Sequence, residues 1–174
     1  DNLRGGLGID TLFGGLGSDT LDGGADNDTM DGGADNDVML GGLGNDRLLG
    51  GVGNDDLSGN EGADTLLGGD GEDTLSGGIG NDTLDGGADT DTLTGGAGAD
   101  VFKFSALTDS VGTGNKYDRI TDFEDGVDRL DVSALGFIAL DTDGGLTEAG
   151  ELRFSYISTS NRTYIRSDQS DFQF

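Results

Sequence analysis

A nine-residue motif repeats without insertion from Gly5 to Lys103 and constrains the fold more than any other feature of the chain. Its consensus is G-G-x-G-x-D-x-U-x, where U is a large apolar residue. Position 6 is aspartate throughout: Asp10, Asp19, Asp28, Asp37, Asp46, Asp55, Asp64, Asp73, Asp82, Asp91 and Asp100. Position 8 is Leu12, Leu21, Met30, Met39, Leu48, Leu57, Leu66, Leu75, Leu84, Leu93 and Phe102. A flexible linker would not keep two positions in phase, so the pattern predicts a regular repeat architecture.

The motif divides into a turn and a short strand. Three glycines allow positive φ angles and a close approach of backbone to backbone. The x-U-x segment is typical of a strand with one inward side chain, because strand side chains alternate between faces. Two units then form one coil of 18 residues, and odd and even units stack on opposite edges. The sequence therefore predicts an all-β fold, a parallel β-roll with two nonapeptides per coil.

This arrangement would stack the aspartates about 4.8 Å apart along each edge. One edge would carry Asp10, Asp28, Asp46, Asp64, Asp82 and Asp100, and the other Asp19, Asp37, Asp55, Asp73 and Asp91. Neighbouring carboxylates repel each other unless a cation lies between them. Two carboxylates and four turn carbonyls would form an oxygen cage that suits Ca²⁺ better than Mg²⁺. Five pairs on one edge and four on the other predict about nine calcium ions.

Composition excludes several other functions. The chain has 174 residues and a net charge of −26, with no Cys, His, Pro or Trp. An acidic surface repels nucleic acid and anionic membranes, and no apolar run is long enough to span a bilayer. Without His or Cys, the usual zinc-protease and nucleophile motifs cannot form. We therefore expect no enzyme in this chain. Because it begins at Asp1 rather than Met, we expect a fragment whose catalytic domain lies upstream.

Four substitutions depart from the glycine consensus. Position 4 is aspartate at Asp26, Asp35 and Asp89, and aspartate tolerates a left-handed backbone. The carbonyl could thus keep its place while a carboxylate is added, either as neutral drift or as an extra contact around calcium. Asn60 replaces a second-position glycine and is expected to weaken the sites that use the turn 59–64.

Residues 104–174 are expected to form a β-rich cap on the roll formed by residues 1–103. The nine-residue phase continues through Asp109 and Asp118, so Asp91 is predicted to pair with Asp109, and Asp100 with Asp118. The register then slips by one at Asp128. Residues 151–157 and 162–168 alternate like two strands joined by a polar turn. The expected core of the cap comprises Phe123, Leu130, Val132, Phe137, Phe154, Tyr156 and Tyr164.

The repeats resemble the RTX (hemolysin-type) calcium-binding β-roll. The stretch GGAGADVFKFSALTDS…YDRITDFEDGVDRLDVSALGF, residues 95–137, resembles the C-terminal module of serralysin-type secreted metalloproteases. DVSALGF and RTYIRS are also similar to the R-modules of mannuronan C-5 epimerases. The resemblance covers essentially the whole chain. It implies that the position-6 aspartates bind Ca²⁺, together with Asp109, Asp118 and Asp128 after the repeats.

The resemblance also implies which carbonyls bind the metal. The earlier turn of a site contributes positions 2 and 4, and the later turn contributes positions 1 and 3. Gly42 and Gly44 with Gly59 and Glu61 are one such set. The implied glycine carbonyls are those of Gly24, Gly33, Gly41, Gly42, Gly44, Gly50, Gly51, Gly53, Gly59, Gly62, Gly68, Gly69, Gly71, Gly77, Gly78, Gly80, Gly95 and Gly96.

Three functions are compatible with these features. The first is a calcium-dependent module of a secreted bacterial protein, a metalloprotease by resemblance, which is exported by the type I secretion apparatus and folds outside the cell. The second is an epimerase accessory module that binds an anionic polysaccharide such as alginate through Arg153, Arg162 and Arg166. The third is an adhesin or ice-binding segment. Its threonine ladder at position 7 is interrupted by Val38, Arg47 and Asp56, which argues against a continuous ice-binding face.

Overall fold

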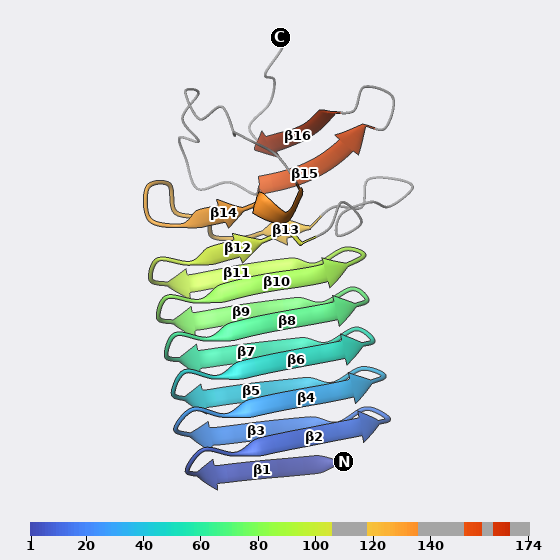
Figure 1. Ribbon diagram of the computed structural model, residues 1–174, viewed down its shortest axis with the longest axis vertical. Helices are drawn as coiled ribbons and strands as arrows, with labels where there is room; N and C mark the ends of the chain where they lie inside the picture. The colour runs from blue at the N-terminus through green and yellow to red at the C-terminus, as the bar shows by residue number, and fades with distance from the viewer. Residues whose placement is uncertain (106–117, 136–151, 158–161, 168–174) are drawn as a thin grey trace.

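Two sheets face each other along the molecule; their repeat strands are parallel, and a turn joins each repeat strand to the next (Figure 1). The computed structural model describes residues 1–105, 118–135, 152–157 and 162–167. Odd-numbered repeat strands form one sheet and even-numbered strands the other, as the sequence predicts. The all-β parallel β-roll is therefore confirmed.

The first sheet has nine strands in the order β1-β3-β5-β7-β9-β11-β13-β15-β16. Their bounds are β1 Asn2–Leu7, β3 Thr20–Ala25, β5 Val38–Leu43, β7 Asp56–Glu61, β9 Thr74–Ile79, β11 Thr92–Ala97, β13 Arg119–Ile120, β15 Leu152–Ile157 and β16 Arg162–Ser167. The second has seven strands in the order β14-β12-β10-β8-β6-β4-β2. Their bounds are β2 Thr11–Leu16, β4 Thr29–Ala34, β6 Arg47–Val52, β8 Thr65–Asp70, β10 Thr83–Ala88, β12 Val101–Lys103 and β14 Arg129–Asp131.

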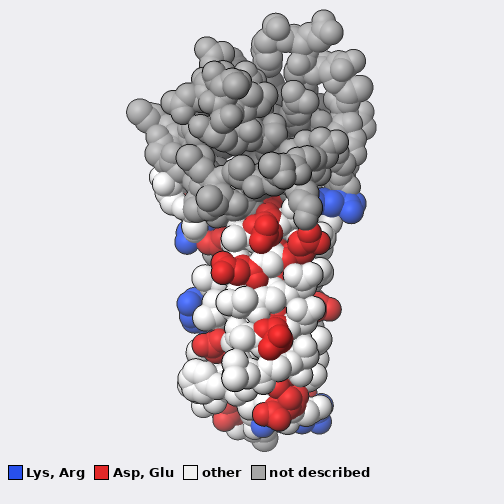
Figure 2. All heavy atoms as spheres, turned by 90° about the vertical axis from the view of Figure 1, so that its right-hand side faces the viewer, with Lys and Arg blue, Asp and Glu red and all other residues white. Residues whose placement is uncertain are grey.

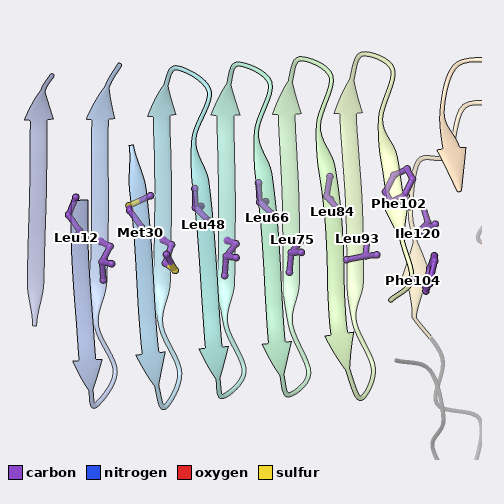
Figure 3. Packing of buried hydrophobic residues seen from close by; sticks show 13 residues of the cluster. Leu12, Met30, Leu48, Leu66, Leu75, Leu84, Leu93, Phe102, Phe104 and Ile120 are labelled. Atoms are coloured by element: carbon purple, nitrogen blue, oxygen red, sulfur yellow. The ribbon is translucent and has the colours of Figure 1, made fainter. Parts of the chain in front are cut away.

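The core of the repeats is one row of position-8 side chains, which the two sheets contribute in turn (Figure 3). Every one of them is 1% exposed or less, except Leu12 at 6%. Strand neighbours match residues 18 apart, as in Leu21 opposite Met39, so equivalent side chains stack directly on one another. One buried side chain per half-coil is a thin core. Much of the stability must therefore come from the backbone ladder and the turns.

The turn glycines allow coils to stack closer than a side chain would permit. Gly62 adopts a φ of 137°. A Cβ placed there would lie far inside van der Waals distance of the carbonyl oxygen of Gly44 in the preceding coil. By contrast, a Cβ on Gly8, whose φ is 98°, would meet nothing within 4 Å. Glycine is thus required at Gly62 for both conformation and space.

Both sheets continue beyond Lys103, although the glycine motif ends there. β13 pairs with β11, placing Ile120 opposite Leu93, and β14 pairs with β12, placing Leu130 opposite Phe102. Phe123, Leu130 and Val132 pack against the core as expected. A 3₁₀ turn follows at Ser133–Leu135. The side chains of Phe137, Phe154, Tyr156 and Tyr164 lie outside the described residues.

The two predicted cap strands are confirmed as the antiparallel pair β15 and β16. The position-7 threonines divide between the sheets, and each row is broken near its middle. Arg47 interrupts the row in the second sheet, and Val38 and Asp56 interrupt the row in the first. In the described residues no helix is long and apolar enough to cross a membrane.

Replacing Gly62 by alanine should destabilise the calcium-loaded roll far more than replacing Gly8. Both changes introduce a Cβ at positive φ, which costs about 1–2 kcal/mol. Only Gly62→Ala also forces a carbonyl oxygen of the preceding coil to move. The free energy of unfolding in denaturant, measured in saturating calcium, compares them. Equal destabilisation by the two variants would contradict this account of the stacking.

Candidate metal centres

The position-6 aspartates form one ladder along each edge of the roll. In each pair, the backbone N–H of the earlier aspartate donates to Oδ1 of the aspartate 18 residues later. The nitrogen-to-oxygen distance is 2.7 Å from Asp10 to Asp28 and 2.8 Å from Asp73 to Asp91. The intervening pairs lie at 2.7–2.9 Å. All nine predicted pairs of aspartates are therefore brought together, five on one edge and four on the other.

The second carboxylate oxygen of each aspartate is buried and has no hydrogen-bond partner. These Oδ2 atoms belong to Asp10, Asp19, Asp28, Asp37, Asp46, Asp55, Asp64, Asp73, Asp82, Asp91 and Asp100. A buried carboxylate oxygen without a partner is costly unless a proton or a cation compensates it. Its recurrence in every unit marks a feature of the repeat. The donor set therefore fits a cation that binds oxygen.

Backbone carbonyls converge on the same spaces. A Cβ placed on Gly23 would lie 2.6 Å from Asp28 Oδ2 and 2.7 Å from the carbonyl oxygen of Gly41. The next coil repeats these distances at Gly41, from Asp46 Oδ2 and Gly59 O. The glycine at position 1 of each unit has no side chain. This leaves a space that faces a carboxylate and a carbonyl of the next turn. Hard oxygen ligands of this kind are those that Ca²⁺ prefers.

Carboxylates supply only part of each possible coordination shell. Across the described ranges, no three acidic side chains converge on one point in the manner of a side-chain metal cluster. The repeat instead offers two aspartates per turn pair, with carbonyls beside them. Backbone oxygens must therefore supply most of the ligands of any bound ion, and this explains why the turn is rich in glycine.

Burial raises the pKa of seven of the ladder carboxyls. It raises the pKa of Asp64, Asp73 and Asp82 to about 6, and the neighbouring carboxylate of the previous coil adds to the effect. The hydrogen bond from the previous aspartate's backbone N–H acts in the opposite direction and is the weaker influence. The pKa values of Asp37, Asp46, Asp55 and Asp100 are raised for the same main reason, burial. Ionised carboxylates here are therefore unfavourable without a compensating charge.

The predicted pairings beyond the repeats are wrong. The backbone N–H of Asp91 donates to Oδ1 of Asp118 at 3.0 Å, and that of Asp100 donates to Oδ1 of Asp128 at 3.0 Å. The separations are 27 and 28 residues instead of 18. The glycine motif ends at Lys103, and Asp118 takes the place expected for Asp109. Asp109 lies outside the described residues.

The sequence did not identify Asp122 as a candidate site residue, although it lies at the last turn of one edge. Its two carboxylate oxygens accept the N–H groups of Gly95 and Gly96, at 2.9 and 2.7 Å. Asp122 falls outside the nine-residue phase, so no periodicity could identify it. The carboxylates of Asp122 and Asp128 both lie close enough to Asp100 to raise its pKa. The last turn thus carries more acidic charge than the turns below it.

Acidic side chains also recur on the outer surface of the roll. Figure 2 shows the edge at the right of Figure 1, with Asp and Glu at intervals along its length. The buried ladder aspartates lie beneath this acidic surface. A negative potential of this kind attracts multivalent cations to the edges.

Comparison with known proteins identifies the family. The family model described as "Peptidase M10 serralysin C terminal" matches residues 4–173. The chain belongs to this family. With its parallel β-roll and its ladders of aspartates, this serralysin C-terminal module is a calcium-binding β-roll module. The resemblance inferred from the sequence is thereby confirmed.

Parts of this module are also similar to mannuronan C5-epimerases of Azotobacter vinelandii. It is 49% identical to AlgE3 over 71 residues, which is 38% of the chain and 4% of AlgE3. It is 52% identical to AlgE5 over 72 residues, which is 39% of the chain and 7% of AlgE5. The matched segments thus span less than a tenth of these relatives. The solution structure of the AlgE6R3 subunit matches 84% of this chain and 65% of that chain, at 36% identity and a TM-score of 0.29.

With calcium chelated, the folded module should become more stable as the pH falls from 7 to about 5. The pKa of Asp64, Asp73 and Asp82 is about 6 in the folded chain, against an ordinary value of 3.8. Between these values the folded chain binds protons that the unfolded chain releases, so stability is lost as the pH rises through 6. The folded fraction in chelator, measured by far-ultraviolet circular dichroism at pH 5 and pH 7, tests this. A larger folded fraction at pH 7 would contradict it.

Replacing Asp82 by asparagine should lower the number of calcium ions bound by roughly one or two, because Asp82 takes part in two pairs. Asp56→Asn is the matched control, since it removes the same charge from an exposed strand position of β7. Equilibrium dialysis with calcium gives the stoichiometry for each variant. If Asp82→Asn retained the wild-type count, the ladder aspartates would not be ligands.

Proposed function

We propose that this module binds about nine calcium ions along its two edges and folds when it binds them, outside the cell. The row of buried, unpartnered Oδ2 atoms is the observation that carries the proposal. The proposed ligands are the paired position-6 aspartates and the turn carbonyls, with Asp118 and Asp128 at the last turns. Asp109 remains a proposed ligand on sequence grounds alone.

Calcium would act on the folding equilibrium by neutralising the ladders. A chain of net charge −26 with a core one side chain wide has little to offset its backbone entropy. Each ion that binds only the folded state adds RT ln(1 + [L]/Kd) to the free energy of unfolding. Low calcium inside a cell would leave the chain extended and suited to export. Higher calcium outside would fold it.

The proposed setting is a secreted bacterial protein in which the module is an accessory part without catalytic function. The family model points to a metalloprotease as the larger protein. Type I secretion is the proposed route, with residues 104–174 as a cap associated with it. The shared segments with epimerases support an extracellular location in the same way.

Far-ultraviolet circular dichroism of the chain, first in chelator and then with added Ca²⁺, tests this proposal. We expect a spectrum typical of an unfolded chain in chelator at pH 7 and a β spectrum in calcium. Magnesium at the same concentration is the control, because it requires tighter octahedral geometry and retains its waters. A β spectrum in chelator that calcium leaves unchanged would refute calcium-linked folding.

A second candidate function is the binding of an anionic polysaccharide. The register places Arg119 opposite Arg153, and Arg153 opposite Arg166, on three neighbouring strands of the first sheet. Residues that pair across strands share a face of the sheet. Three arginines therefore share one row in an otherwise acidic protein. Guanidinium groups pair well with carboxylates such as those of uronic acid polymers.

Calorimetric titration with alginate in saturating calcium tests this second candidate. We expect the double variant Arg153→Ala/Arg166→Ala to bind at least about tenfold more weakly than the wild type. Arg47→Ala, which removes an exposed charge from the opposite sheet, should bind as the wild type does. Absence of binding by the wild type, or equal loss in both variants, would exclude a site on this row.

A further inference from the structure

The backbone conformation at position 4 differs along the roll, and φ is 98° at Gly8 and 91° at Gly17 in the first coil. Six glycines have φ angles between 133° and 147°, a region that side chains rarely enter: Gly44, Gly53, Gly62, Gly71, Gly80 and Gly98. The aspartates at this position lie near the left-handed helical region instead, with φ of 75° at Asp26, 76° at Asp35 and 79° at Asp89. The turns of the roll therefore differ in the conformation of position 4, although all of them carry an Asp at position 6.

In five of these six glycine turns, the position-4 N–H donates to a backbone carbonyl of the next coil. Gly44 N donates to the carbonyl oxygen of Glu61 at 2.8 Å, and Gly62 N donates to that of Ile79 at 2.8 Å. The same bond joins Gly53 to Asp70, Gly71 to Ala88 and Gly80 to Ala97. Each acceptor is the carbonyl of position 3, which therefore faces the gap between two consecutive turns of one edge. This is the gap that the aspartate pair borders.

In the first coil a carboxylate replaces that carbonyl as the acceptor. Gly8 N donates to Asp26 Oδ2 at 3.0 Å, and Gly17 N donates to Asp35 Oδ2 at 3.2 Å. Ala25 and Ala34 occupy position 3 of these turns, in the same strand register as Glu61 and Asp70. Their carbonyls are thereby relieved of the N–H group that occupies the equivalent carbonyls of Glu61, Asp70, Ile79, Ala88 and Ala97.

We propose that Asp26 and Asp35 are positioning residues that raise the calcium affinity of the first turn pair on each edge. By accepting the N–H groups of Gly8 and Gly17, they leave the carbonyl oxygens of Ala25 and Ala34 to the cation. The inference rests on the proposed calcium function of the edges. It makes the two ends of the roll unequal, with the tighter carbonyl ligands in the first coils.

Asp89 provides a matched control within the chain. It has the same position in the motif and the same φ as Asp26 and Asp35. However, the N–H of Gly71, in the preceding coil, still donates to the carbonyl oxygen of Ala88, at 3.3 Å. The Asp89 carboxylate has therefore not taken over that bond. Removing it should leave the carbonyl of Ala88 as it is.

The test is a calcium titration of protein labelled with ¹³C at the alanine carbonyls, followed by NMR. In the wild type, the Ala25 and Ala34 signals should shift on binding. In Asp26→Gly/Asp35→Gly their midpoint should move to about fivefold higher calcium, because one hydrogen-bond acceptor per site is lost. Asp26→Asn/Asp35→Asn should restore the wild-type midpoint, since the amide oxygen accepts the same bond and Asn tolerates this φ. Asp89→Gly should match the wild type.

Three results would overturn the proposal: an unchanged midpoint in the double glycine variant, an equal weakening in the asparagine variant, or an equal weakening in Asp89→Gly. The asparagine result would assign the effect to charge, and the Asp89 result to general destabilisation. Failure of the calcium function itself looks different. In that case no alanine carbonyl of the wild type would respond to calcium.

Discussion

The repulsion between buried carboxylates, stacked one strand spacing apart, is the constraint on which the rest of the roll depends. Each ladder aspartate from Asp28 to Asp100 uses one oxygen to accept the backbone N–H of its neighbour and leaves the other oxygen buried and unpartnered. The hydrogen bond fixes the carboxylate in place, so the side chain cannot swing out to water without breaking the ladder. Compensation must therefore come from a proton or a cation. Neutral pH favours the cation.

The glycines and the single core residue of each repeat follow from that constraint. Carbonyl oxygens can face a cation between coils only where the backbone turns tightly, and position 1 leaves the necessary space because it has no Cβ. The strand between two turns then needs just one apolar side chain to hold the sheets together. A larger core would make the fold stable without metal. In the proposed function, the thin core is what makes folding responsive to calcium.

Much of this architecture could be predicted from the sequence because the repeat is strictly periodic. The invariant Asp10-to-Asp100 phase determined the two edges, and the Leu and Met positions determined the core. Prediction failed after Lys103, where residues that keep the nine-residue phase no longer occupy equivalent places in the coils. Asp118 retains the phase but lies beside Asp91 instead of Asp100, and the glycine motif ends before it, at Lys103. The differences in φ at position 4 were also hidden, since Gly8 and Gly44 are the same letter in the sequence.

The central claim is that cations occupy the spaces between paired aspartates. Crystals grown in calcium, with anomalous diffraction collected to locate the ions, test it most directly. The account predicts a row of anomalous peaks along each edge, each in contact with Oδ2 of two position-6 aspartates such as Asp64 and Asp82. A well-ordered roll without peaks between those carboxylates would contradict it.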